Sequence, residues 1–142
     1  MSKYYHITTP DAWKYIQKNG LKCDDEGNIF LLNTMFPAVV EFVAFGQLFG
    51  SQKDYVLIEV DGRGIDGPLD IDNVAEISAY LGHQWIVKQD SISIKHLKFM
   101  HKRTLTEESA KISYEQVMNK FKSVQEKYKR KRKRKNKQDG KN

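Results

Sequence analysis

The amino-acid sequence predicts an α+β fold, in which two helices flank a small mixed or mostly antiparallel sheet, followed by a C-terminal helix and a disordered basic tail. Short runs of β-branched and aromatic residues alternate with two segments that carry helix-starting residues. After Arg103, apolar residues recur at helical spacing and then give way to a run of cations. We therefore expect a folded domain over residues 1–103, an amphipathic helix over residues 104–128 and a disordered tail over residues 129–142.

The N-terminal part predicts a strand, a helix and a second strand. Residues 3–7 are β-branched and aromatic, as strands favour. Thr9 supplies a hydroxyl N-cap and Pro10 suits the first helical position, while Gly20 is expected to end the helix with a positive φ. A turn over residues 24–27 and a buried strand over residues 28–32 should follow.

The middle of the chain predicts a second helix and further strands. Pro37 opens a helix that runs to Phe49 and is apolar on almost all sides, so we expect it to be buried. Residues 54–60 give the strongest strand pattern, and residues 61–73 predict a loop because they hold three glycines, a proline and four aspartates. Short strands are expected at residues 84–88 and 91–95, with residues 96–102 extending the second.

The C-terminal segment predicts one long helix. Residues 104–107 have the spacing of a capping box. The following apolar residues recur at spacings of 4, 3 and 4, which makes a narrow seam that packs on the body or dimerises with a second copy. The seam consists of Val117, Phe121, Val124 and Tyr128.

The net charge of +6 is unevenly distributed along the chain. Residues 129–142 contain nine basic residues and one acidic residue, whereas residues 1–128 contain 15 basic and 17 acidic residues. Adjacent cations repel one another, so we expect the tail to be disordered unless an anion neutralises it. The tail predicts sequence-independent binding to DNA or RNA, and a merely solubilising terminus is the alternative. Its cations are Lys129, Arg130, Lys131, Arg132, Lys133, Arg134 and Lys135.

Several classes of protein are disfavoured by what the sequence lacks. No apolar run approaches the ~18 residues of a membrane span, and no signal-peptide pattern is present. The single cysteine, Cys23, supports neither a disulfide framework nor a structural zinc site, and the four histidines lack metal-ligand spacing. We therefore expect no metal, no membrane partner and a cytoplasmic location.

Five short motifs, taken in order, resemble the ADP-ribosyltransferase fold, which poly(ADP-ribose) polymerases, DNA ADP-ribosylating toxins and RNA 2′-phosphotransferases share. They are Tyr5-His6-Ile7-Thr8, Ile16-Gln17-Lys18-Asn19-Gly20-Leu21, Gly27-Asn28-Ile29-Phe30-Leu31, the strand at residues 55–61, and Gln84-Trp85-Ile86-Val87. The resemblance covers roughly residues 4–97. It implies a split sheet, NAD as a substrate, and transfer of ADP-ribose to a macromolecular acceptor, for which nucleic acid is one candidate.

The resemblance also implies roles for individual residues. His6, with Ile7 and Thr8 beside it, would hydrogen-bond a ribose hydroxyl of NAD. Phe30 would stack on nicotinamide, and a second aromatic residue on the following helix would be Phe42 or Phe45. Gln84 occupies the position of the catalytic glutamate.

Two departures from the family pattern bear on catalysis. Phe30 replaces a tyrosine and lacks its hydroxyl, and Gln84 replaces a glutamate and lacks its charge. Removing one such electrostatic group typically costs ~10²–10³ in rate. The chain would then be slow, recruit another acid such as Glu59 or Glu76, or bind without turnover. The phosphotransferase branch fits poorly, since Arg63 is the single arginine before Arg103.

Three functional hypotheses therefore remain open. The first is an NAD-dependent ADP-ribosyltransferase, a glycosyltransferase whose tail brings it to a nucleic acid. The second is a catalytically inactive module of the same fold that binds nucleic acid or a protein partner through its basic C-terminal helix and tail. The third is a partner-binding protein that dimerises through the apolar seam. Each site residue also fits a structural role: His6 at a turn, Phe30 and Trp85 in the core, Gln84 on an edge strand.

Overall fold

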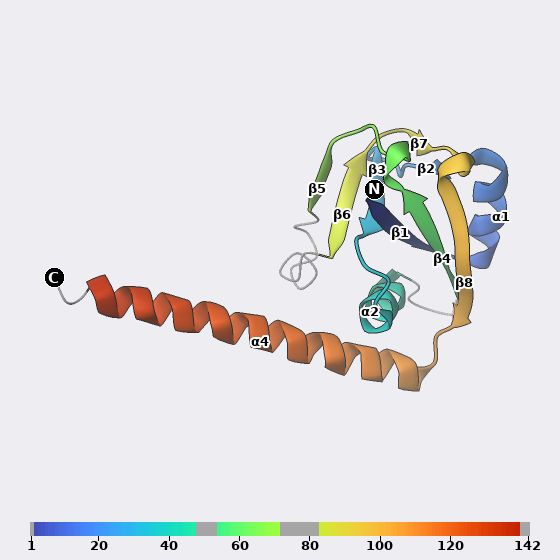
Figure 1. Ribbon diagram of the computed structural model, residues 1–142. Coiled ribbons are helices and arrows are strands. Elements are labelled where there is room, and N and C mark those ends of the chain that lie inside the picture. The colour runs from blue at the N-terminus through green and yellow to red at the C-terminus, as the bar shows by residue number, and fades with distance from the viewer. Residues whose placement is uncertain (1, 48–53, 72–82, 140–142) are drawn as a thin grey trace.

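The computed structural model describes residues 2–47, 54–71 and 83–139. Its main sheet is antiparallel, with the strand order β5-β6-β3-β1-β4-β8, and a second sheet pairs β2 with β7 (Figure 1). The predicted α+β class is confirmed. The strands are β1 (Lys3–Thr8), β2 (Leu21–Lys22), β3 (Asn28–Leu32), β4 (Asp54–Asp61), β5 (Leu69–Ile71), β6 (Gln84–Lys88), β7 (Ser91–Ile92) and β8 (Leu97–Thr104). The helices are α1 (Pro10–Asn19), α2 (Pro37–Gln47) and α4 (Glu107–Asp139), with short 3₁₀ turns η1 (Gly62–Gly64) and η2 (Ile94–His96).

Both faces of the sheet are buried, and β4 contributes to both. Val56, Ile58 and Val60 face one core, which includes Ile16 of α1. The alternate residues Tyr55 and Leu57 face a second core, which includes residues of α2. Because successive side chains of a strand point to opposite faces, α1 and α2 cover opposite sides of the sheet.

The two flanking helices lie close to their predicted bounds. The Oγ1 of Thr9 accepts a hydrogen bond from the backbone N–H of Ala12 at 3.1 Å, and Gly20 follows the last residue of α1 with φ of 79°. The second helix begins at Pro37 as expected. It is buried along one side, but the Phe45 side chain is 51% exposed, so burial all round is wrong.

Gly20 gives a test of this capping geometry. A Cβ at this position would lie 2.8 Å from the carbonyl oxygen of Ile92, and the positive φ itself is strained for alanine. We expect Gly20→Ala to lower the free energy of unfolding by about 1–3 kcal/mol in urea titrations. Gly27 has a similar φ of 81° with open space around it, so Gly27→Ala should cost less. Equal losses would contradict the steric argument.

Two strand predictions in the second half of the sheet are corrected. The expected loop over residues 61–73 contains η1 and the short strand β5, whose Asp70 pairs with Ile86 of β6. The apolar–polar–apolar pattern of β5 is only three residues long, and the glycines and aspartates around it favour a loop. The expected strand over residues 91–95 divides into β7 and η2, and β8 is a separate edge strand.

The helix α4 begins two residues later than its predicted capping box. Thr106 and Ser109 form the reciprocal pair, each backbone N–H donating to the other side-chain oxygen at 3.0 Å. Thr104 is the last residue of β8, where its hydroxyl donates to the Oδ1 of Asp54 at 2.6 Å. The sequence has the spacing of two overlapping capping boxes, which begin at Thr104 and Thr106. Because Thr104 pairs with β4, only the second box caps the helix.

The first turns of α4 pack along α2, and its later turns project from the body (Figure 1). Val117 is buried in this contact region, so its part of the predicted seam packs on the chain's own body. The side chains of Val124 and Tyr128 lie outside the described residues. Instead of a disordered tail from residue 129, the backbone stays helical to Asp139. Lys and Arg are strong helix formers, and extending an existing helix avoids the cost of nucleation.

Candidate functional site

His6 lies on β1, where its ring reaches the neighbouring strand β3. Its Nδ1 is 2.8 Å from the carbonyl oxygen of Phe30. The two strands pair at Tyr5 and Leu32, so the ring bridges the strands just beyond that pair. A carbonyl oxygen can only accept, so Nδ1 must carry the proton of this bond. The ring thus reaches the backbone of Phe30, but the two side chains lie on opposite faces of the sheet. His6 pairs with Ile58, which faces the core beneath α1, whereas Phe30 alternates with Leu32, which faces the core beneath α2.

The protonation state of this imidazole follows from its surroundings. Burial lowers the pKa of His6 below its ordinary value, and the bond to the Phe30 carbonyl raises it by a smaller amount. The ring is therefore neutral at pH 7. With Nδ1 protonated, Nε2 keeps a lone pair and is an acceptor for a hydroxyl donor.

Phe30 and Gln84 lie on adjacent strands. The register of β3 and β6 pairs Phe30 with Ile86 and Leu32 with Gln84. Gln84 therefore lies on the same face of the sheet as Phe30, two residues further along the strands. The Phe30 side chain is 36% exposed, so it is not a core residue. Gln84 is half-buried on a strand flanked by β5 and β3, so the edge-strand alternative is wrong.

The other predicted NAD contacts are placed less favourably. Ile7 is 5% exposed and its side chain belongs to the core beneath α2. Thr8 is half-buried at the end of β1. Phe42 stacks on Tyr114 of α4, with ring centroids 6.0 Å apart, so one face of its ring is already covered. Phe45 is exposed on α2.

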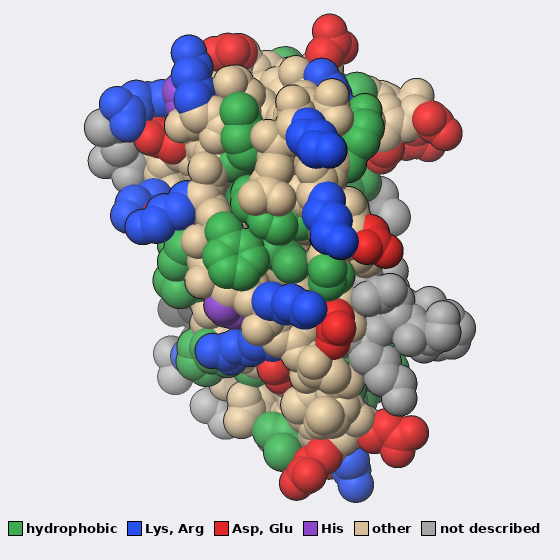
Figure 2. All heavy atoms as spheres, turned by 90° about the vertical axis from the view of Figure 1, so that its right-hand side faces the viewer, with side chains coloured by type: hydrophobic (Ala, Val, Ile, Leu, Met, Phe, Trp, Pro, Cys, Tyr) green, Lys and Arg blue, Asp and Glu red, His purple; other side chains and the backbone are tan. Residues whose placement is uncertain are grey.

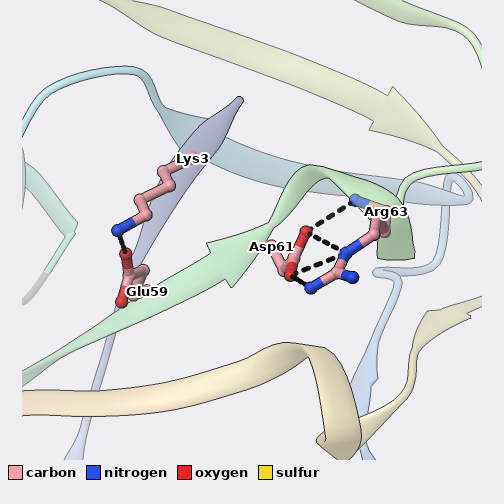
Figure 3. A network of polar contacts seen from close by, with 4 residues as sticks. All are labelled: Lys3, Glu59, Asp61 and Arg63. Atoms are coloured by element: carbon pink, nitrogen blue, oxygen red, sulfur yellow. Dashed lines mark hydrogen bonds and ion pairs between the residues drawn. The ribbon is translucent and has the colours of Figure 1, made fainter. Parts of the chain in front are cut away.

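A charged hollow of about 290 Å³ lies where β1, β4 and β8 meet η1 and η2. Two ion pairs line it, Lys3 with Glu59 at 3.0 Å and Arg63 with Asp61 at 2.6 Å (Figure 3). The guanidinium of Arg63 also donates from Nε, and this network lowers the pKa of Asp61 to about 2. Glu59, one of the substitute acids considered above, is thus engaged by Lys3, and Glu76 lies outside the described residues.

A second hollow, of about 520 Å³, lies beside the start of α2. Burial raises the pKa of Tyr55 in its wall, and burial lowers the pKa of His101 next to it. Sequence analysis singled out neither residue, because β8 brings His101 to Tyr55 only through long-range pairing. His6, Phe30 and Gln84 line neither of these two hollows. The other lining residues of the second hollow are Met35, Phe36, Pro37, Val40 and Arg103.

Two further properties concern the described part of the chain. It contains no group of three or more His, Cys, Asp or Glu side chains arranged to hold a metal ion. Across residues 2–47, 54–71 and 83–139, no helix has the length and apolarity needed to cross a membrane. Comparison with protein-family models, with curated proteins and with solved structures found no match to this chain.

Proposed function

We propose that the chain is an ADP-ribosyltransferase-like protein that binds NAD beside His6 and Phe30. The hydrogen bond between His6 and the Phe30 carbonyl carries this proposal. It joins residues 24 positions apart that the family resemblance assigns to one site. It also fixes the proton of the neutral ring on Nδ1, so Nε2 can accept a hydrogen bond from a ribose hydroxyl.

The family resemblance implies a division of labour among three residues, of which Phe30 and Gln84 share a face of the sheet. The Nε2 of His6 would accept a hydrogen bond from a ribose hydroxyl of NAD, and the exposed Phe30 ring would stack on nicotinamide. Gln84, on the same face as Phe30, would approach the ribose as the glycosidic bond breaks. In that step nicotinamide leaves with the bonding electron pair, and the acceptor's nucleophile attacks the cationic ribose carbon.

The first experiment is calorimetric titration of NAD and of ADP-ribose into the full chain. We expect wild type to bind both, because both carry the ribose and phosphates. His6→Ala should weaken binding by about tenfold, the value of one hydrogen bond near 1.4 kcal/mol. His96→Ala is the matched control, since His96 lies on η2 and should leave the affinity unchanged.

The outcomes separate clearly. Absence of NAD binding by the wild-type chain would overturn the proposal. Equal affinities of wild type and His6→Ala would remove His6 from the site. Because His6 is neutral at pH 7, we also expect affinity to fall once acid protonates Nε2, which then donates instead of accepting.

A second candidate function is nucleic-acid binding without turnover. The course of α4 favours it, because the seven cations at residues 129–135 lie on one continuous helix that leaves the body (Figure 1). Phe30 and Gln84 also favour it, since the hydroxyl and the negative charge of the family pattern are both missing. A nucleic acid would then be the ligand of α4 and not an acceptor of ADP-ribose.

A further inference from the structure

The face made by β8 and α1 combines exposed aromatic rings with cations. β8 is an edge strand of the main sheet. The Phe99 side chain on it is 46% exposed and lies against Trp13 of α1, with ring centroids 6.0 Å apart and planes tilted by 34°. Tyr15 of α1 is 57% exposed. Figure 2, which faces this side of the molecule, shows hydrophobic side chains in the middle with Lys and Arg side chains on both sides.

The charge here is opposite to that of the body as a whole. Residues 94–103 contain four Lys or Arg and no Asp or Glu, although residues 1–128 carry a slight excess of acids. Of these cations, Lys102 is 4.0 Å from Asp54, a weak and exposed pair, and Lys98 lies opposite Glu59, which Lys3 already engages. All four side chains are exposed: Lys95, Lys98, Lys102 and Arg103.

Protection of the sheet edge does not account for this composition. Edge lysines do discourage strands of other molecules from pairing. An exposed phenylalanine at the middle of the same edge has the opposite effect, because it invites association. A ligand with both a flat apolar surface and negative charge would satisfy both kinds of side chain.

The spacing along β8 fits such a ligand. Phe99 and Lys102 pair with Ile58 and Val56 of β4, so they lie on the face covered by α1. Lys98 lies roughly 13 Å from Lys102 along the strand and on its other face, so cations flank Phe99 on both sides of the edge. The pairing of β8 with β4 has an irregularity between Ile58 and Leu57, where β8 contains a bulge. This bulge bends the edge strand next to Phe99. Cations that track a backbone, with an aromatic ring between them, are typical of proteins that bind single strands.

We infer that the β8–α1 face binds single-stranded nucleic acid, with an unpaired base stacked on Phe99 and phosphates held by Lys95, Lys98 and Lys102. Bases of a duplex are stacked on one another and present no free face to Phe99. An acidic peptide added along the β8 edge would depend on backbone hydrogen bonds and charge but not on an aromatic ring. This surface is separate from the NAD site and from the basic part of α4.

The test measures fluorescence anisotropy of labelled twelve-nucleotide oligothymidine, oligouridine and a twelve-base-pair duplex with the full chain. Roughly 0.3 M salt suppresses the electrostatic contribution of α4 and leaves stacking in place. We expect Phe99→Leu, which keeps apolar contact with Trp13, to weaken single-strand binding by about 5- to 100-fold. Phe99→Tyr should keep wild-type affinity, and binding of the duplex should be unaffected by either change.

Phe36→Leu is the matched control, since Phe36 is 56% exposed beside α2. Thermal melting of each variant establishes that it is folded. Unchanged single-strand affinity in a folded Phe99→Leu variant would overturn the proposal. The proposal would also be overturned if the wild-type chain bound an acidic peptide and no single strand. In that case Phe99→Leu and Phe99→Tyr would bind the peptide as well as wild type does. These variants leave His6 in place, so failure of the wild-type chain to bind NAD would be a separate result that leaves this proposal untouched.

Discussion

Replacing the seven cations at residues 129–135 with glutamine is expected to lower the affinity for duplex DNA by about 10³-fold near 50 mM salt. Each cation that neutralises a phosphate releases a condensed counterion, and this release dominates non-specific binding. The basic residues lie on a helix whose backbone projects from the body (Figure 1). Glutamine has nearly the helix propensity of lysine and arginine, so the helix itself should persist.

The salt dependence is the more specific measurement. Seven phosphate contacts give a slope of roughly −6 for log affinity against log salt with duplex DNA, and the glutamine variant should flatten it. Exchange of Arg130, Arg132 and Arg134 for lysine keeps the charge and is the matched control. A control variant as weak as the glutamine variant would mean that arginine geometry, and not charge, determines binding. An unchanged slope in the glutamine variant would place the duplex-binding surface on the body.

The elements that the sequence predicted well are those set by neighbouring residues. The start of α1 needs only Thr9 and Pro10, and its end needs Gly20, so local rules suffice. The strand β4 is apolar on both faces, because α1 and α2 cover both sides of the sheet, and its composition alone identified it.

The elements predicted poorly depend on partners distant in the sequence. β5 exists because β6 pairs with it, and Thr104 stays in β8 because Asp54 holds its hydroxyl. The capping alternatives at residues 104 and 106 are indistinguishable without that pairing. For residues 129–139, charge repulsion favours disorder, but extension of the helix that begins at Glu107 outweighs it.

The candidate site shows the same division. Motif order points to His6 and Phe30, and the His6 ring does reach Phe30, but the atom that it contacts is a backbone carbonyl, which no side-chain pattern encodes. The two side chains lie on opposite faces of the sheet. Ile7 was included because it adjoins His6, and strand alternation sends it to the opposite face and into the core. The pairing of Phe42 with Tyr114 depends on how α4 docks on α2, which the periodicity of either helix alone does not specify.

Gln84→Glu is expected to raise the rate of NAD cleavage by about 10²–10³-fold over wild type. The departing nicotinamide leaves positive charge on the ribose, and a carboxylate held nearby stabilises that charge more than a neutral amide does. Gln84 is on the same face of β3–β6 as Phe30, so the new charge would lie beside the proposed nicotinamide contact. Release of nicotinamide, measured chromatographically, gives the rate with and without an acceptor.

The control is Lys88→Glu, which adds negative charge at the other end of the same strand, opposite Asn28. That variant should cleave NAD no faster than wild type, because its charge is several residues from the site. Combining Gln84→Glu with His6→Ala distinguishes a shared site from an unrelated gain. If both residues act on one ribose, the loss of His6 should remove most of the increase, since groups that act as a unit are not additive. An increase that survives in the double variant would place Gln84 in a different site from His6. No increase at all, with NAD still bound, would favour a fold that has kept its ligand and lost its chemistry.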